Sequence, residues 1–229
     1  MIPLRDNNPT RRRPVVTISI IVLCALVYLW QMTLQGAAGQ SVVYSLGLIP
    51  AVLSGRAELS GPLQLVPAPL TLISSMFLHG GLLHVGGNML YLWIFGDNIE
   101  DRLGRGAFVI FYLLCGIAAG LTQAVADLGS EVPMIGASGA VSGVLGAYLI
   151  LYPHARVLVV IPLFILFYTF ELPAVIVLGI WFVGQLLSSM AQGSGQAGVA
   201  FSAHVGGFIA GIVLLQVFLR LRGTRRRLR

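Results

Sequence analysis

The sequence has few charges and no lysine. Charged residues make up 10% of its 229 positions, hydrophobic residues make up 57%, and all 14 basic residues are arginine. The mean hydropathy is +0.90. A water-soluble domain of this length could not bury so much apolar surface, so the composition indicates a protein whose solvent is largely lipid.

Cysteine is also scarce. The two cysteines, Cys24 and Cys115, each lie inside an apolar run, where a thiol is more often a packing residue than part of a disulfide or a metal pair. The sequence has no Cys/His cluster, no His-x-x-x-His pair and no phosphate-binding loop. We therefore expect neither a metal ion nor another cofactor.

The arginines gather near the two ends of the chain, at residues 11–13 and 220–229. A basic tail can bind nucleic acid, but no folded basic face accompanies these runs, and each of them flanks an apolar segment. We therefore expect no nucleic-acid partner and attribute the arginines to membrane topology.

Six apolar segments are candidates for membrane-spanning helices, which predicts an all-α, polytopic bundle. They are residues 15–32, 82–95, 106–126, 138–152, 172–190 and 201–220. Residues 33–80 form a long connection expected to lie against the membrane surface, and residues 157–170 are expected to be an interfacial segment. The fourth span is short: its 15 residues reach about 22 Å, less than the ~30 Å hydrocarbon core. Its first residues must therefore lie below the membrane surface.

The positive-inside rule favours six spans over seven. With six, a basic N-terminus (1–14) and a basic tail (221–229) lie on the cytoplasmic side of a membrane domain (15–220). Of the 14 arginines, only Arg56 is then outside. A seventh span would move the Arg-rich tail to the outer side.

Four polar residues meet at the outer ends of the spans in this topology. Ser138 begins the fourth span, His204 lies near the start of the sixth, and His84 and Asn88 lie near the start of the second. Each has an ordinary alternative role: Gly-x-Ser-Gly also packs helices closely, a lone histidine is often a satisfied polar group, and His84 with Asn88 can hold a loop. Their joint placement favours a site, because ionisable groups inside spans are usually functional.

Ser138 is the candidate nucleophile of this site. Gly136 and Gly139 allow a turn and close approach, and the unpaired amides of a helix start can face a developing oxyanion. His204 is the candidate general base, because the two glycines that follow it let the sixth helix approach the fourth.

Two further features of the predicted site are its oxyanion donors and the absence of a carboxylate beside His204. His84 and Asn88 are four residues apart and share one helical face, where they can add oxyanion donors. Asp127 and Glu131 lie in the loop before the fourth span and are expected to be solvated. With no carboxylate at the depth of His204, the predicted site is a Ser-His dyad rather than a triad.

These motifs, in this order, resemble the rhomboid family of intramembrane serine proteases over about residues 70–220. The segments that carry the resemblance are Met76-Phe77-Leu78-His79-Gly80, the His84-x-x-x-Asn88 pair, the turn Glu100-Asp101-Arg102-Leu103-Gly104, Gly136-Ala137-Ser138-Gly139, and Ala203-His204-Val205-Gly206-Gly207 followed by Gly211.

The resemblance implies a serine endopeptidase with Ser138 as nucleophile and His204 as base. It implies an oxyanion site made by the Ser138 amide with His84 and Asn88. Substrates would be single-span membrane proteins, cut within or near the outer part of the bilayer without metal or ATP. The fifth helix and residues 192–199 would act as a lateral gate and a cap.

Six helices with a long first outer loop are similar to the prokaryotic form of the family. This form implies a multi-pass protein of the prokaryotic cytoplasmic (inner) membrane, in contact with its lipid. Both termini would be cytoplasmic and the site would open to the outer face. The sequence does not indicate an oligomeric state.

Two features depart from the family pattern. Many members carry an aromatic residue four positions after the nucleophile, stacked on the histidine; here that position is Ser142, so His204 needs another neighbour. A Trp-Arg pair that some members carry in the long outer loop is absent.

Two other functions fit part of this pattern. An inactive rhomboid-like protein that binds transmembrane helices without cleaving them need not keep both Ser138 and His204, and this chain keeps both. A small transporter usually shows intramembrane charges or inverted repeats, and no clear repeat is present.

Overall fold

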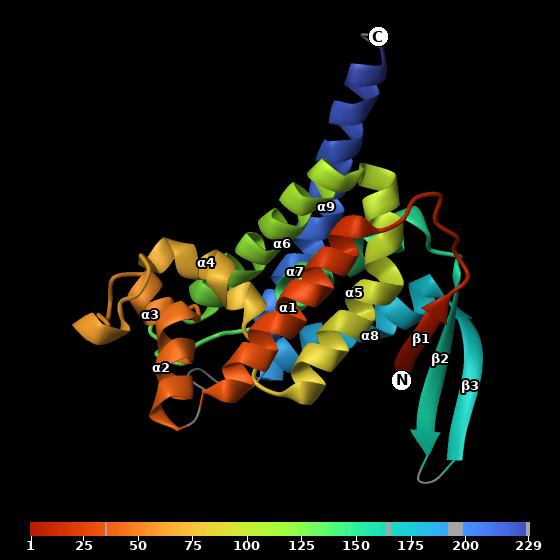
Figure 1. Cartoon of the computed structure of the whole chain (residues 1–229). Coiled ribbons are helices and arrows are strands. Elements are labelled where there is room, and N and C mark those ends of the chain that lie inside the picture. The colour runs from red at the N-terminus through yellow and green to blue at the C-terminus, as the bar shows by residue number, and fades with distance from the viewer. Residues whose placement is uncertain (35, 164–165, 192–198, 228–229) are drawn as a thin grey trace.

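The structure, a computed structural model, describes residues 1–34, 36–163, 166–191 and 199–227, and most of them are helical (Figure 1). The long helices are α1 (Val15–Thr33), α5 (Leu82–Leu103), α6 (Arg105–Ala126), α7 (Ser138–Leu151), α8 (Ala174–Ala191) and α9 (Phe201–Arg227). The predicted helical bundle is confirmed. Helix α5 runs eight residues beyond the predicted segment 82–95, because charged residues end its apolar run without ending the helix.

The described residues contain four helices that are long and apolar enough to cross a membrane alone: α1, α6, α8 and the Phe201–Leu221 part of α9. A fifth span results if Gly61–Phe77 and α5, bent by 83° relative to one another, are counted together. Helix α7 is a shorter apolar helix. The protein is therefore a multi-pass membrane protein with four to five candidate spans by this measure, and the count of six stays a prediction.

The predicted long connection folds into short helices beside α6 (Figure 1). They are α2 (Ala37–Leu46), α3 (Pro50–Leu53), the 3-10 turns Gly61–Leu63, Ala68–Leu70 and Ser75–Phe77, and α4 (Thr71–Ser74). Leu48 exchanges two backbone hydrogen bonds with Met134, at 3.0 and 2.7 Å, and the Gly136 amide donates to the Ser75 carbonyl at 2.9 Å. The connection thereby fixes the segment that leads into α7.

A small antiparallel sheet, absent from the all-α prediction, stands beside α5 and α8. It contains β1 (Ile2–Asp6), β2 (Arg156–Leu163) and β3 (Leu166–Pro173) in the order β1-β2-β3. The described residues of the segment 157–170, expected to be interfacial, thus lie in the paired strands β2 and β3. The expected N-terminal tail contributes a strand, pairing Ile2 with Val160. Hydropathy alone could not show this pairing, since the partners are far apart in the sequence.

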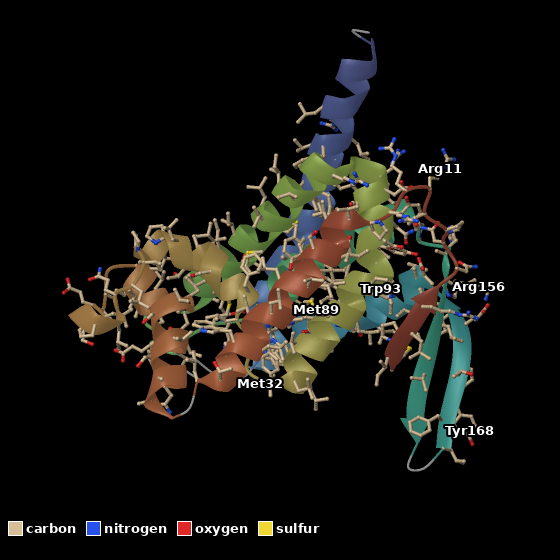
Figure 2. All side chains as sticks on the ribbon, in the orientation of Figure 1. Arg11, Met32, Met89, Trp93, Arg156 and Tyr168 are labelled. Atoms are coloured by element: carbon tan, nitrogen blue, oxygen red, sulfur yellow. The ribbon has the colours of Figure 1, made fainter. Side chains whose placement is uncertain are left out.

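The N-terminal arginines and the end of α1 lie apart. Figure 2 shows Arg11 near the start of α1 and Met32 at the opposite end of that helix, while Tyr168 lies near the tip of the hairpin. In β3, Tyr168 and the other side chains from Leu166 to Glu171 are exposed.

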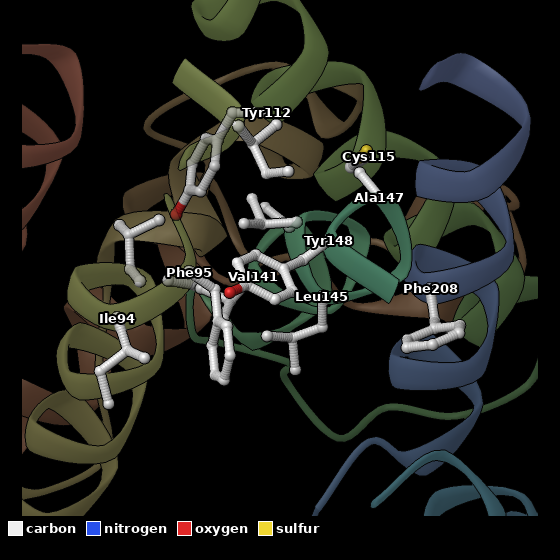
Figure 3. Close-up of a cluster of buried hydrophobic side chains, with 14 of the residues drawn as sticks. Ile94, Phe95, Tyr112, Cys115, Val141, Leu145, Ala147, Tyr148 and Phe208 are labelled. Atoms are coloured by element: carbon white, nitrogen blue, oxygen red, sulfur yellow. The ribbon is translucent and has the colours of Figure 1, made fainter. Parts of the chain in front are cut away.

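Helix α7 forms the centre of the bundle. Every residue from Gly139 to Tyr148 is buried, as expected of a helix that is apolar all round. Near its end, Tyr148 meets Phe95 of α5 edge to face, with ring centroids 4.9 Å apart (Figure 3). The Tyr148 hydroxyl also donates a hydrogen bond to the Asp6 carboxylate of β1. The core therefore joins the sheet to the bundle.

Glycines let α7 and α9 touch backbone to backbone. A Cβ atom at Gly207 would collide with the carbonyl oxygen of Gly139, and one at Gly211 with that of Gly143. The expectation that glycines let the helix carrying His204 approach the helix carrying Ser138 is confirmed. This contact sets the distance between Ser138 and His204.

The start of α1 is capped by a side chain from another helix. The helix has no side-chain cap of its own. The buried Glu100 carboxylate of α5 instead accepts hydrogen bonds from the amides of Val16 (3.0 Å) and Thr17 (2.8 Å) and from the Thr17 hydroxyl (2.9 Å). Amides at a helix start need such acceptors and favour a negative charge, so Glu100 fixes α1 onto α5.

Candidate active site

Ser138 and His204 are in hydrogen-bonding contact. The Ser138 hydroxyl, on the first residue of α7, lies 2.8 Å from Nε2 of His204, near the start of α9. His204 is buried, with 8% of its surface exposed. A serine held this way beside an imidazole nitrogen has the arrangement of a nucleophile and its base.

The backbone before Ser138 needs a glycine. Gly136 has φ +123°, and a Cβ there would lie 2.6 Å from Nε2 of His84. Both facts exclude a larger residue without strain. Because Ser138 begins α7, its amide has no acceptor within the helix and is free to face a reacting group.

His84 and Asn88 of α5 line the same cavity as Ser138 and His204. The Gly80 amide donates to Nδ1 of His84 at 3.2 Å, so in the neutral ring the hydrogen is on Nε2, the atom nearest Gly136. The Asn88 side-chain nitrogen is buried and has no hydrogen-bond partner among the described residues. An unpaired buried donor is costly, so this nitrogen is available for a group that enters the cavity.

The cavity has a volume of about 660 Å³ and is lined by residues of α5, α6, α7, α8 and α9 and of the connections that precede α5 and α7. Its lining, as far as the structure describes it, includes no aspartate or glutamate. Asp127 and Glu131, expected to be solvated in the preceding loop, are not part of it. Across the described ranges no three His, Cys, Asp or Glu side chains are arranged to hold a metal ion.

Two neighbours of His204 come from α8, and neither was predicted from the sequence. Nδ1 of His204 lies 2.6 Å from Oε1 of Gln185. The Trp181 ring, one turn earlier, lies 5.9 Å from the imidazole at an interplanar angle of 33°. Ser142 instead donates its hydroxyl to the Ser138 carbonyl at 2.6 Å. The sequence does contain a feature that indicates Gln185: an amide side chain in an apolar span requires a polar partner.

His79 attaches the long connection to helix α1, and it does not line the cavity. Its amide donates to Oε1 of Gln31 at 3.0 Å, and its carbonyl accepts from Nε2 of Gln31 at 3.4 Å. Its ring meets His84 edge to face at 5.3 Å. The residues expected to form a cap, 192–199, lie outside the described residues except for Val199, which lines the cavity.

Fold and site together define a multi-pass membrane protein with a Ser-His pair in a cavity between its helices. The Rhomboid domain family model matches residues 68–221, more than half of the chain. The chain belongs to the rhomboid family of intramembrane proteases.

Curated relatives come from several lineages. The chain is 33% identical over 159 residues to rhomboid protein 1, mitochondrial, of Saccharomyces cerevisiae, covering 65% of this chain and 41% of that protein. It is 32% identical over 140 residues to the mouse presenilin-associated rhomboid-like protein, mitochondrial, covering 58% of this chain and 37% of that protein. It is 42% identical over 79 residues to the rhomboid protease GluP of Bacillus subtilis, covering 34% and 15%. The chain thus spans less than half the length of these relatives.

Proposed function

We propose that this protein is an intramembrane serine endopeptidase that uses a Ser138–His204 dyad. The observation that carries the proposal is the 2.8 Å contact between Ser138 Oγ and His204 Nε2 inside a cavity walled by membrane helices. The family match and the names of relatives such as the rhomboid protease GluP support the same reaction class.

The reaction begins when His204 takes the hydroxyl proton of Ser138. Ser138 Oγ attacks the carbonyl carbon of the scissile peptide bond, and the resulting oxyanion accepts hydrogen bonds from the Ser138 amide, His84 Nε2 and Asn88 Nδ2. His204 then protonates the leaving amine, which departs and leaves an acyl-enzyme. Water, deprotonated by His204, hydrolyses the ester and restores Ser138.

Substrates of this reaction are single-span membrane proteins. A peptide bond within a helix is enclosed by its own hydrogen-bonded spiral, so the segment must unwind before Ser138 can reach it. Residues of α5 and α8 are among those that line the cavity. We propose that a substrate helix arriving from the lipid enters between these two helices, with α8 as the lateral gate.

The topology we propose has six spans, of the type found in prokaryotic members. The basic N-terminus (1–14), which precedes the membrane domain (15–220) in the sequence, and the basic tail (221–229), which follows it, both lie in the cytoplasm. The site opens to the outer face of the cytoplasmic membrane. The arginine distribution supports this orientation. The short α7 (Ser138–Leu151) supports it too, because in this topology its first residue, Ser138, lies below the membrane surface.

The test uses purified protein in liposomes with a model single-span substrate. We expect cleavage by the wild type and none by Ser138→Ala or His204→Ala, with all three folded. Cleavage that survives Ser138→Ala would overturn the dyad. If no form cleaves, labelling by a serine-directed fluorophosphonate decides. Labelling that depends on Ser138 indicates the wrong substrate, and its absence indicates an inactive helix-binding protein.

A further inference from the structure

Gln185 holds an unusual place for a polar side chain. It lies within α8, whose earlier residues are apolar or glycine (Ala174 to Gly184). An amide in a membrane span is costly unless it is hydrogen-bonded. Its oxygen lies 2.6 Å from Nδ1 of His204, on the side of the ring opposite the Ser138 contact.

The chemistry of the amide oxygen sets the state of the imidazole. This oxygen can only accept, so the ring nitrogen that faces it must carry the hydrogen. With the hydrogen on Nδ1, the lone pair of the neutral ring is on Nε2, directed at the Ser138 hydroxyl. This is the tautomer that a general base requires, and in triads a carboxylate selects it.

We propose that Gln185 is the positioning residue of His204: it selects the catalytic tautomer and orients the ring, the role a carboxylate has in a triad. This inference rests on the proposed protease function. Trp181, one helical turn before Gln185, packs against the same ring at 5.9 Å. Helix α8 thus supplies both the acceptor and the aromatic neighbour that position 142 lacks.

Because Gln185 and Trp181 are both on α8, the state of the dyad depends on the position of this helix. The nucleophile is on α7 and the base on α9, whereas both groups that hold the base are on a third helix. A displacement of α8 away from α9 breaks the contact between Gln185 and His204. The dyad is therefore complete only while α8 is seated against α9.

Three substitutions at Gln185 test the role of the acceptor. Gln185→Met keeps the size and removes the oxygen. Gln185→Asn keeps the amide but withdraws it by one methylene. Gln185→Glu keeps an acceptor at the same reach. The matched control is Ser189→Ala, which removes a different hydrogen bond between α8 and α9, the 2.7 Å contact of Ser189 Oγ with Ser202 Oγ.

Two readouts separate positioning from packing or gating. The first is the rate at which a small fluorophosphonate labels Ser138, because this probe needs a reactive dyad but no transmembrane substrate. The second is the division of the cleavage rate into kcat and KM in liposomes. We expect Gln185→Met and Gln185→Asn to lower the labelling rate and kcat by about tenfold to a hundredfold, the effect of losing one hydrogen bond to a ring that becomes charged in the reaction. KM should stay unchanged.

The remaining variants complete the test. Gln185→Glu should recover most of the labelling rate, and Ser189→Ala should stay within about twofold of the wild type. Wild-type labelling rates in both Gln185→Met and Gln185→Asn would overturn the inference. So would an equal loss in Gln185→Glu or in Ser189→Ala, which would indicate packing. If Gln185→Met fails to fold, the labelling rates of Gln185→Asn and Gln185→Glu decide: a slower rate in Asn than in Glu supports the inference, and equal rates overturn it. Failure of the proposed function is distinct: the wild type would then show no Ser138-dependent labelling.

Discussion

The α-carbon of Gly211 in α9 lies against the carbonyl group of Gly143 in α7, with no room for a side chain between them. One turn nearer the site, Gly207 meets Gly139 in the same way. These two contacts hold the helices that carry His204 and Ser138 at the separation of a hydrogen bond. The dyad geometry is therefore a result of backbone packing as much as of the two side chains.

We expect Gly211→Val to destabilise the protein by about 1–3 kcal/mol or more, the usual cost of overpacking. It should also abolish cleavage, because it separates α9 from α7. Thermal unfolding in detergent and a cleavage assay measure the two effects. Gly179→Ala on α8, where a Cβ meets nothing within 4 Å, is the control and should leave both unchanged. Wild-type stability in Gly211→Val would contradict the packing argument.

Asn88 provides a test of the oxyanion site. Its buried side-chain nitrogen has no partner in the described part of the chain. We expect Asn88→Ala to lower kcat about a hundredfold to a thousandfold with little change in KM, as for the loss of one oxyanion donor. Asn88→Asp keeps the shape of the side chain, but an ionised carboxylate cannot donate a hydrogen bond, so kcat should fall in this variant as well. Full activity in the Asp variant would remove Asn88 from the mechanism.

Glu100 is expected to govern stability rather than catalysis. Glu100→Ala leaves two amides and one hydroxyl at the start of α1 without their acceptor, which costs about 1–3 kcal/mol or more. We expect a clearly lower melting temperature in detergent. Glu58→Ala, at an exposed position of the long connection, is the control. A melting temperature equal to that of the control would show that α1 is held by its apolar contacts alone.

Asp6 is expected to make stability depend on pH. Burial raises the pKa of the Asp6 carboxyl above its ordinary value of 3.8, although the Tyr148 hydroxyl opposes this shift. The folded protein therefore binds this proton more tightly than the unfolded chain, and its contribution is lost as pH rises through the raised pKa. We expect Asp6→Asn, which mimics the neutral form, to be more stable than the wild type at neutral pH and similar to it near pH 3.8. Melting curves over this range check the sign, and a constant difference would contradict it.

Substrate unwinding gives a prediction on sequence preference. Two single-span substrates that differ only near the cut, one with Gly and Pro and one with Leu throughout, should differ in cleavage rate. The Gly/Pro form should be cut faster, because these residues are weak helix formers, by about 1 and 3 kcal/mol relative to Ala. Equal initial rates in the same liposomes would show that unwinding does not limit the reaction.

The sequence by itself determined the apolar helices and the four polar residues of the candidate site. Long apolar runs and the glycines around Ser138 and His204 are local patterns, and a bilayer allows few structures other than helices for such runs. The order of the motifs was also sufficient to indicate the family.

Only the tertiary structure decided which residues support that site. The contact of Gln185 with His204, the capping of α1 by Glu100 and the pairing of Ile2 with Val160 join segments that are separate in the chain. No periodicity within one segment encodes such partners. They follow from the packing of the elements in three dimensions, which brings a polar group of one segment to an unsatisfied group of another.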